Sequence, residues 1–237
     1  MERKGLVIAA MSARRVKLTN NNGKPCFFPS TVNIRDIHFR LVAIVLFEKK
    51  IPFECHVVDW TKNEHKSPEY LEKHPFGQVP YLLEAKYPNQ GPKLAPDSSD
   101  IKAKAMFDQA ASIEVSNFGP LVDKASYEAV MKPTDPKPGR YLKQPKNEAN
   151  YNEAIKALDA KLDGYERILA KQKYLAGNEL TMIDLFHLPS GARLALGGND
   201  ILTSKGPHIA RWWKDISSRE SWAQVQKGLA PGLVMFD

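Results

Sequence analysis

One stretch of the chain reads His74-Pro75-Phe76-Gly77-Gln78-Val79-Pro80. Gly77 is typical of a turn, and residues 79–83 form a predicted strand whose second residue is Pro80. Proline in this place removes a hydrogen-bond donor from the sheet. A cis peptide bond before Pro80 would turn the backbone of Val79 outward, where it can pair with an extended ligand. A trans bond would make residues 79–83 an ordinary edge strand, and the spacing leaves both forms open.

Upstream of this stretch, helix and strand patterns alternate. Apolar residues recur at three- and four-residue intervals over residues 39–47, which predicts an amphipathic helix that ends before Pro52. Residues 53–60 follow as a predicted strand, and Ser67 before Pro68 marks the start of a second helix. Alternating helices and strands predict an α/β layer over residues 36–90.

The first 35 residues differ from the rest of this half. They are rich in asparagine, proline and basic residues and show no clear period, apart from a predicted short strand at residues 15–19. Residues 6–11 faintly resemble a signal sequence, but the apolar stretch is short and no convincing cleavage site follows. We expect an atypical N-terminal segment over residues 1–35 and an intracellular, cytoplasmic protein.

From about residue 100 onward every predicted element is helical. Residues 132–146 contain four prolines and a glycine, which predicts a loop between helices. The next helix carries an apolar stripe and is expected to end at Gly177 as its cap. Thr181 and Asp184 have the spacing of a capping box, and a last helix is predicted to run through residues 212–222. The sequence thus predicts an all-α domain over residues 98–237.

Composition excludes several classes of protein. The 237 residues include 34 Lys and Arg against 27 Asp and Glu, a net charge of +7, but Lys and Glu alternate along most of the chain. This pattern favours an ordinary solvated surface over a nucleic-acid site. The longest apolar run, residues 41–47, is far shorter than the ~20 residues of a membrane span. We therefore expect neither a nucleic-acid partner nor a membrane segment.

Cysteine and histidine provide little chemistry by themselves. Cys26 and Cys55 are too few for a disulfide framework, and no Cys-x-x-Cys or histidine pair has the spacing of metal ligands. Lys66 lies in the polar segment Glu64-His65-Lys66, where its ammonium could hold a ligand carboxylate. A plain solvated lysine is the commoner outcome at such a place. We predict no metal, and the histidines outside this segment are interpreted as structural or exposed.

Several segments together closely resemble phi-class glutathione transferases, particularly those of fungi and plants. The segments are residues 64–71 (EHKSPEYL), 75–80 (PFGQVP), 117–118 (NF), 174–185 (YLAGNELTMIDL) and 212–216 (WWKDI). The resemblance covers residues 40–85 and 90–225. It implies an α/β thioredoxin-like N-terminal domain that holds reduced glutathione, followed by an all-α C-terminal domain. The second domain would supply an apolar pocket, with residues near Phe118, for a hydrophobic electrophile.

The resemblance also implies roles for individual residues. Val79, before the family's cis proline Pro80, would pair its backbone with the cysteinyl part of glutathione, and Gln78 lies beside it. His65 and Lys66 would face the glycine carboxylate. Glutathione would be a co-substrate rather than a bound cofactor, no metal would be needed, and the usual assembly is a homodimer.

The chain departs from the family pattern after Pro80. In the family, a turn, a further strand and a helix that starts with an acidic residue and a serine bind the γ-glutamyl end. Here residues 83–87 join directly to what resembles the segment after that helix, as though a piece were missing. Asp97-Ser98 has the right residue types but comes too late, and we predict that it starts the next helix. The thioredoxin-like domain is therefore expected to be incomplete, with its glutathione pocket open on one side.

A second departure concerns the group that activates the thiol. The family's catalytic serine lies a few residues before an Arg-Val pair, which corresponds here to residues 40–42, and counting back leads to Asp36. A carboxylate there would raise the pKa of a nearby thiol. Ser30 or Thr31 could serve only with a longer loop. The catalytic residue is therefore left unknown.

Two functions follow as hypotheses. The first is a glutathione transferase that conjugates glutathione to a hydrophobic electrophile, in detoxification or in a secondary-metabolite biosynthetic pathway. The matches at Lys66 and residues 78–80 favour it. The second is a non-catalytic, ligand-carrying or protein-interaction relative, which the missing piece and the absent serine favour.

Overall fold

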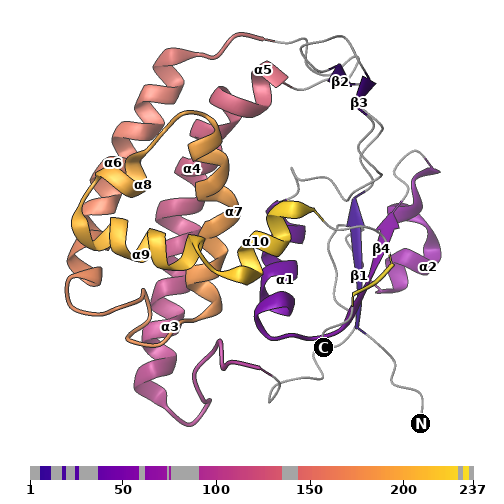
Figure 1. Ribbon diagram of the computed structural model, residues 1–237, viewed down its shortest axis with the longest axis horizontal. Coiled ribbons are helices and arrows are strands. Elements are labelled where there is room, and N and C mark those ends of the chain that lie inside the picture. The colour runs from indigo at the N-terminus through magenta and orange to yellow at the C-terminus, as the bar shows by residue number, and fades with distance from the viewer. Residues whose placement is uncertain are drawn as a thin grey trace. The chain divides into compact units, whose positions relative to one another are not determined.

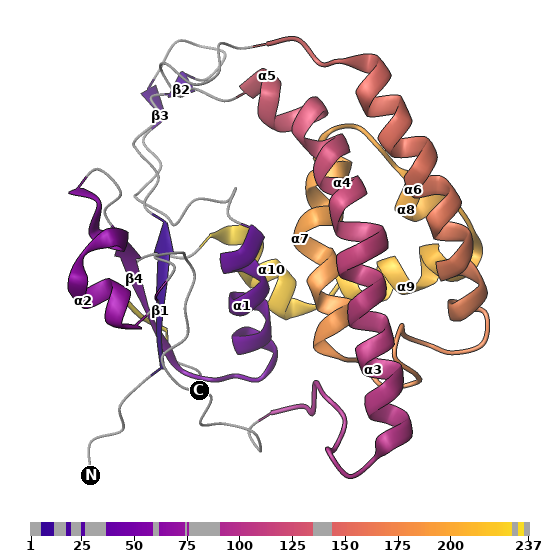
Figure 2. The ribbon, with the colours of Figure 1, turned by 180° about the vertical axis from the view of Figure 1, so that it is seen from behind.

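The computed structural model describes residues 6–11, 18–19, 25–26, 37–58, 62–73, 75, 91–134, 144–228 and 232–234 (Figures 1 and 2). The chain divides into two compact units. Residues 1–92 and 220–237 form the first unit, and residues 93–219 form the second. The first unit thus includes residues 220–237. These residues were predicted to belong to the helical domain over residues 98–237.

A three-stranded sheet is the centre of the first unit. Its order is β1 (Leu6–Met11), β4 (Phe53–Val58) and β5 (Gly232–Val234). β1 runs parallel to β4, with Leu6 opposite Phe53, and β5 runs antiparallel to β4, with Val234 opposite Phe53. Helix α1 (Ile37–Glu48) connects the two parallel strands, so the predicted helix and strand at residues 39–60 are confirmed with slightly different ends.

Two strands of this sheet were not predicted from the sequence. β1 is a continuous apolar run, which is typical of a strand in a parallel pair but also resembles a short leader segment. β5 is only three residues long and pairs with a strand far away in the sequence. The described part of the predicted strand at residues 15–19 is β2 (Leu18–Thr19), which pairs antiparallel with β3 (Pro25–Cys26). Residues 15–17 lie outside the described residues.

Helix α10 (Glu220–Lys227) packs against α1 in the first unit (Figure 1). The Arg40 guanidinium lies 5.7 Å from the ring centre of the buried Trp222, and Ser221 Oγ donates a hydrogen bond of 2.6 Å to Glu48 Oε2. The predicted single helix over residues 212–222 is therefore wrong. Residues 218–219 separate α9, which buries Trp212 and Trp213 in the second unit, from α10, which buries Trp222 in the first.

The turn after α1 explains why position 91 is glycine. Gly91 has a φ of +67°, and a Cβ there would lie 2.5 Å from the carbonyl oxygen of Lys49. The Lys49 ammonium also donates to the Pro92 carbonyl at 2.9 Å. Both the backbone conformation and the close approach therefore require glycine at this position.

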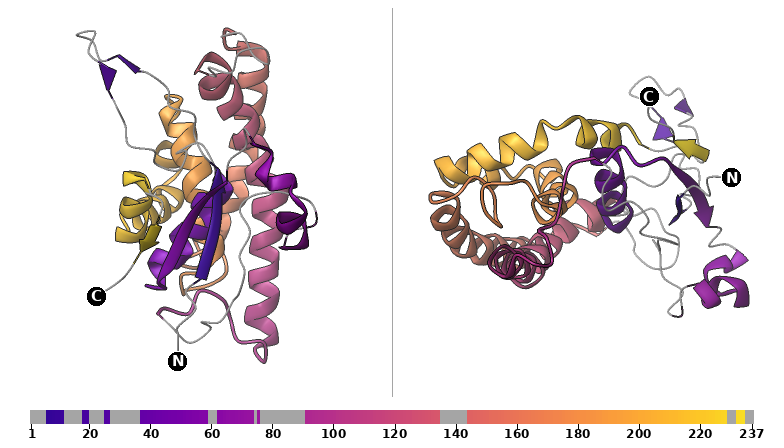
Figure 3. Two further views of the ribbon diagram at one scale, coloured as in Figure 1. Left: turned by 90° about the vertical axis from the view of Figure 1, so that its right-hand side faces the viewer. Right: turned by 90° about the horizontal axis from the view of Figure 1, so that it is seen from below.

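The regular elements of the second unit are helices in its described part (Figures 2 and 3). Its helices are α3 (Ile101–Ile113), α4 (Gly119–Ser126), α5 (Lys132–Thr134), α6 (Glu148–Leu169), α7 (Met182–Leu196), α8 (Ile201–Ser204) and α9 (Pro207–Ser217). Two π-helical turns, Glu114–Phe118 and Tyr127–Met131, lie on either side of α4. The α/β layer followed by helices that the sequence predicts is thereby confirmed.

The core of this unit forms where α4, α6, α7 and α9 meet. The buried residues of α6 recur every three or four positions, as the predicted stripe requires. The largest fully buried side chains of this unit are Phe118, Leu158, Leu162, Tyr165, Leu169, Leu185, Leu188 and Trp212. These contacts hold the helices of the unit together.

Two predicted boundaries in this unit need correction. Residues 132–134, which were predicted to belong to the loop at 132–146, form α5, and α6 starts at Glu148, after the predicted loop. α6 ends at Leu169 rather than at Gly177, which pairs with Tyr174 and has a φ of +140°. The carbonyl of Leu169, the last residue of α6, instead accepts a hydrogen bond of 3.1 Å from the Arg211 guanidinium.

Candidate functional site

A 3-10 turn at Glu64–Lys66 places two predicted site residues in the first unit. It follows strand β4 in the chain and begins after Asn63, which has left-handed backbone angles (φ 54°, ψ 31°). The amide of Lys66 donates to Asn63 O at 2.8 Å, and the amide of Ser67 donates to Glu64 O at 3.0 Å. These bonds fix the turn so that His65 is buried and Lys66 is exposed.

The turn leads directly into helix α2 (Pro68–Lys73). Ser67 Oγ accepts the amide of Tyr70 at 3.2 Å, and Pro68 occupies the first helical position, as predicted. The side chain of Tyr70 is buried. Lys66 is thereby held on a short, well-defined connection between a strand and a helix.

The electrostatics of this turn suit an anionic ligand. Burial, and secondarily the charge of Lys66, lowers the pKa of His65 below its ordinary value, so the imidazole is neutral at pH 7. The exposed Lys66 ammonium supplies the positive charge and up to three hydrogen-bond donors. A charged donor of this kind can hold a carboxylate by a charge-assisted hydrogen bond.

The other predicted site residues lie outside the described residues. These are Gln78, Val79 and Pro80, together with the positions considered for thiol activation, Ser30, Thr31 and Asp36. Asp97 and Ser98, which were predicted to start the next helix, lie just before it. Asp100 caps that helix through a 2.9 Å bond to the amide of Ala103, and α3 begins at Ile101.

Phe118, near which the pocket for the electrophile was expected, lies in the interior of the helical unit. Phe118 is fully buried, and its ring centre lies 4.5 Å from that of His187 and 6.1 Å from that of Tyr165. Tyr165 Oη lies 3.0 Å from His187 Nε2, and His187 Nδ1 lies 2.8 Å from Ile183 O. Phe118 therefore belongs to the hydrogen-bonded core of the helical unit.

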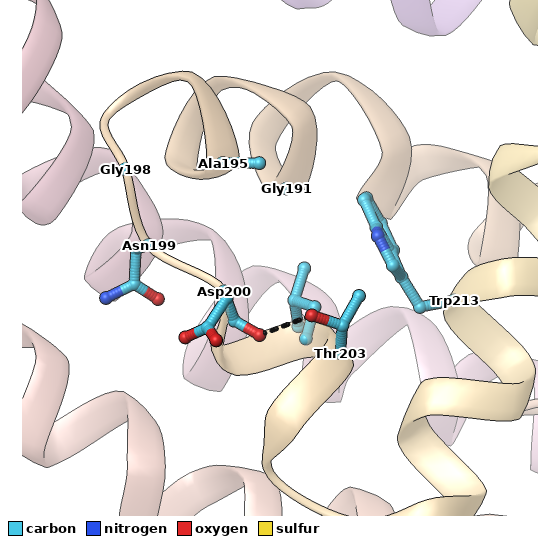
Figure 4. A pocket seen from close by; sticks show the side chains of 8 residues that line it. Gly191, Ala195, Gly198, Asn199, Asp200, Thr203 and Trp213 are labelled. Carbon is cyan, nitrogen blue, oxygen red and sulfur yellow. Dashed lines mark hydrogen bonds between the residues drawn. The ribbon is translucent and has the colours of Figure 1, made fainter.

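Sequence reasoning missed two features of the helical unit. Glu114 lies in the first π-helical turn, where burial, and secondarily the charge of Asp123, raises its pKa to about 7. A cavity of about 300 Å³ is the second feature (Figure 4). Its walls include Gly191, Ala195, Asn199, Asp200, Leu202 and Trp213. Small residues within a helix give no sequence signal for such a cavity.

Among the described residues, no group of three or more His, Cys, Asp or Glu side chains is arranged to hold a metal ion. None of the helices that the structure describes is both long and apolar enough to cross a membrane.

Comparison with family models matches both halves of the chain. Residues 31–89 match the glutathione S-transferase N-terminal domain, and residues 123–220 match the glutathione S-transferase C-terminal domain. The turn at residues 64–66 lies within the first match, and the cavity-lining residues lie within the second.

Curated relatives agree with these matches. Glutathione S-transferase PM239X14 of Arabidopsis thaliana is 45% identical over 174 residues, which cover 66% of this chain and 76% of the relative. Glutathione S-transferase hmp2 of Hypomyces subiculosus is 34% identical over 200 residues, covering 78% and 91%. The sequence resemblance to plant and fungal members is confirmed.

Solved structures show the same architecture. Glutathione transferase F2 of Populus trichocarpa superposes with a TM-score of 0.72 and 26% identity, covering 94% of this chain and 97% of the other. Poplar glutathione transferase F1 superposes with a TM-score of 0.70 and 27% identity, covering 95% and 98%. A thioredoxin-like domain followed by a helical domain, as predicted, is confirmed by these matches.

Proposed function

Because the chain belongs to the glutathione S-transferase family, of phi-like type, we propose that it conjugates reduced glutathione to a hydrophobic electrophile. In this reaction the glutathione thiolate attacks an electrophilic carbon and a sulfur–carbon bond forms. The thiol proton passes to solvent, and a leaving group departs with the electron pair of the bond that breaks. Detoxification and a secondary-metabolite pathway are both settings for this chemistry.

The turn at Glu64–Lys66 carries the proposal. It presents an exposed ammonium at Lys66 beside a buried, neutral imidazole at His65. We propose that Lys66 binds the glycine carboxylate of glutathione and that His65 supports that contact. Gln78, Val79 and Pro80 are proposed to bind the cysteinyl part, with the backbone of Val79 as the pairing group.

Location and assembly complete the proposal. We propose a cytoplasmic protein that acts as a homodimer and needs no metal. The support for these three points is the family to which the chain belongs. None of the contacts described above bears on them.

Steady-state kinetics of Lys66→Ala test the assignment of the pocket. With chlorodinitrobenzene as the electrophile, we expect the KM for glutathione to rise about three- to tenfold, because an exposed charge-assisted hydrogen bond is lost. The kcat should change much less, because Lys66 binds the peptide away from the reacting sulfur. The matched control is Lys62→Ala, which removes an exposed lysine four residues earlier. Equal KM values in both variants and the wild type would overturn the assignment.

A further inference from the structure

The cavity in the helical unit has no role in the proposed reaction. It is formed by the second half of α7, the turn at residues 198–200, α8 and one side chain of α9. All of these residues belong to the second unit. Its volume of about 300 Å³ is at the lower end of the range for small-molecule sites.

Two small residues on α7 line this space. A Cβ at the buried Gly191 would lie 2.4 Å from Cη2 of Trp213 and 2.7 Å from Cδ1 of Leu202. The indole therefore lies directly against the backbone of α7. Ala195, one turn later on the same face, is exposed and contributes only a methyl group. The result is a hollow with the Trp213 ring as one wall, as Figure 4 shows.

The polar groups around the cavity differ in how many hydrogen-bond partners they already have within the protein. Both polar atoms of the Asn199 side chain have a partner, because Oδ1 accepts the amide of Ile201 at 3.0 Å and Nδ2 donates to Tyr151 Oη at 3.0 Å. Thr203 Oγ1 donates to the Asp200 carbonyl at 2.8 Å. The exposed Asp200 carboxylate has only one long bond, from Ser204 Oγ at 3.4 Å to Oδ1, among the described contacts.

Both electrostatic features of the cavity favour a cation. Asp200 is the one charged residue among the described side chains that line it. The C-terminal end of the 15-residue helix α7 also lies here, since Ala195 and Gly198 are lining residues. The carbonyl end of a helix carries partial negative charge and stabilises cations near it.

We propose that this cavity binds a small protonated arylalkylamine. Its flat ring would pack against Trp213, Leu202 and the methyl group of Ala195, and its ammonium group would lie at the rim beside Asp200. This site is separate from the proposed binding of glutathione, because it is built only from residues of the helical unit.

Calorimetric titration of the full-length protein with three probes tests the chemistry of the ligand. The probes are 2-phenylethylamine, phenylethanol and phenylpropionate, which share a ring and differ in charge. We expect the amine to bind with a dissociation constant in the millimolar range or tighter, phenylethanol to bind about threefold more weakly, and phenylpropionate to bind least. An absence of binding by the amine, or tighter binding of phenylpropionate, would overturn the proposal.

Three variants test the position of the site. Ala195→Leu fills the cavity from an exposed helical position and should abolish amine binding without unfolding the protein, which a thermal melt verifies. Asp200→Asn should remove the preference for the amine over phenylethanol. Leu196→Ala, at an exposed residue outside the lining, is the matched control and should bind like the wild type. Amine binding that survives Ala195→Leu would show that the amine does not bind in this cavity.

Discussion

Asp184 accepts a hydrogen bond from the indole of Trp212, with 3.0 Å between Oδ1 and Nε1. Both side chains are fully buried. The same carboxylate accepts the amide of Leu175 at 2.9 Å and both the amide and the hydroxyl of Thr181 at 3.0 Å. One side chain at the start of α7 therefore satisfies donors from the preceding loop, from its own helix cap and from α9.

Replacement of Asp184 by alanine should strongly destabilise the helical unit. The change removes the acceptor for four buried donors and breaks the capping box, so we expect a loss of about 3 kcal/mol in the free energy of unfolding. Urea denaturation measures the loss. Asp108→Ala, which removes an exposed carboxylate paired with Lys104, should change stability by less than about 0.5 kcal/mol. Similar midpoints for the two variants would contradict this role of Asp184.

A glycine and a glutamate determine how α9 begins. Glu166 accepts the amides of His208 at 3.0 Å and Ile209 at 2.9 Å, and a Cβ at Gly206 would lie 2.6 Å from its carboxyl carbon. Gly206→Ala should displace the carboxylate and destabilise the protein by about 1 kcal/mol, as the loss of a helix cap does.

Gly164→Ala is the control for this substitution. A Cβ at Gly164, inside α6, would meet no atom within 4 Å. Alanine there should raise stability by about 0.5–1 kcal/mol because it favours the helix. The midpoints of thermal denaturation should therefore be lower than in the wild type for Gly206→Ala and higher for Gly164→Ala. Equal shifts of the two midpoints would contradict the role of Glu166 at the start of α9.

The buried His187 makes stability depend on pH. Burial lowers its pKa in the folded protein to about 4, below the ordinary value of 6.5. The unfolded chain therefore binds this proton more readily, so the contribution of His187 to stability is complete above pH 6.5 and is lost as the pH decreases toward 4. The raised pKa of Glu114 gives a contribution of the opposite sign over this range, so the test compares variants rather than the wild type alone. The pKa difference corresponds to about 3 kcal/mol.

Denaturation at pH 7.5 and pH 4.5 tests this assignment. His187→Gln removes the titrating group and should show a smaller difference in unfolding free energy between the two conditions, although it is less stable at the higher pH. His208→Gln, at a partly exposed position, is the control and should keep the wild-type difference. An unchanged pH dependence in His187→Gln would assign the effect to other groups.

The last strand is expected to stabilise the first unit. A chain that ends after Gly228 keeps α10 but loses β5, which pairs with Phe53, Glu54 and Cys55 of β4. We expect a loss of about 1–3 kcal/mol in that unit, from the lost backbone hydrogen bonds. Amide hydrogen exchange should be faster in β4 and unchanged in α6. Equal protection of β4 in both chains would contradict the pairing.

Local sequence signals predicted those features that depend on neighbouring residues. The capping box at Thr181 and Asp184 and the serine cap before Pro68 are both present, because such motifs involve residues only three positions apart. The buried stripe of α6 was also predicted, since helical spacing alone determines which residues share a face.

Features that depend on distant residues could not be predicted. β5 pairs with a strand about 180 positions earlier in the chain, and three residues carry no recognisable period. Phe118 was expected near a pocket, but the packing of Tyr165 and His187 around it makes it part of the core. The cavity brings together residues of α7, α8 and α9, and the Trp213 ring in its wall lies against Gly191, which only the folded chain shows.

Calorimetric titration with reduced glutathione tests the central claim most directly. The wild-type chain and Lys62→Ala should bind with a dissociation constant in the millimolar range or tighter, which corresponds to about 4 kcal/mol or more. Lys66→Ala should bind about three- to tenfold more weakly. A folded wild-type protein that gives no heat of binding would contradict the assignment of this chain as a glutathione-dependent transferase.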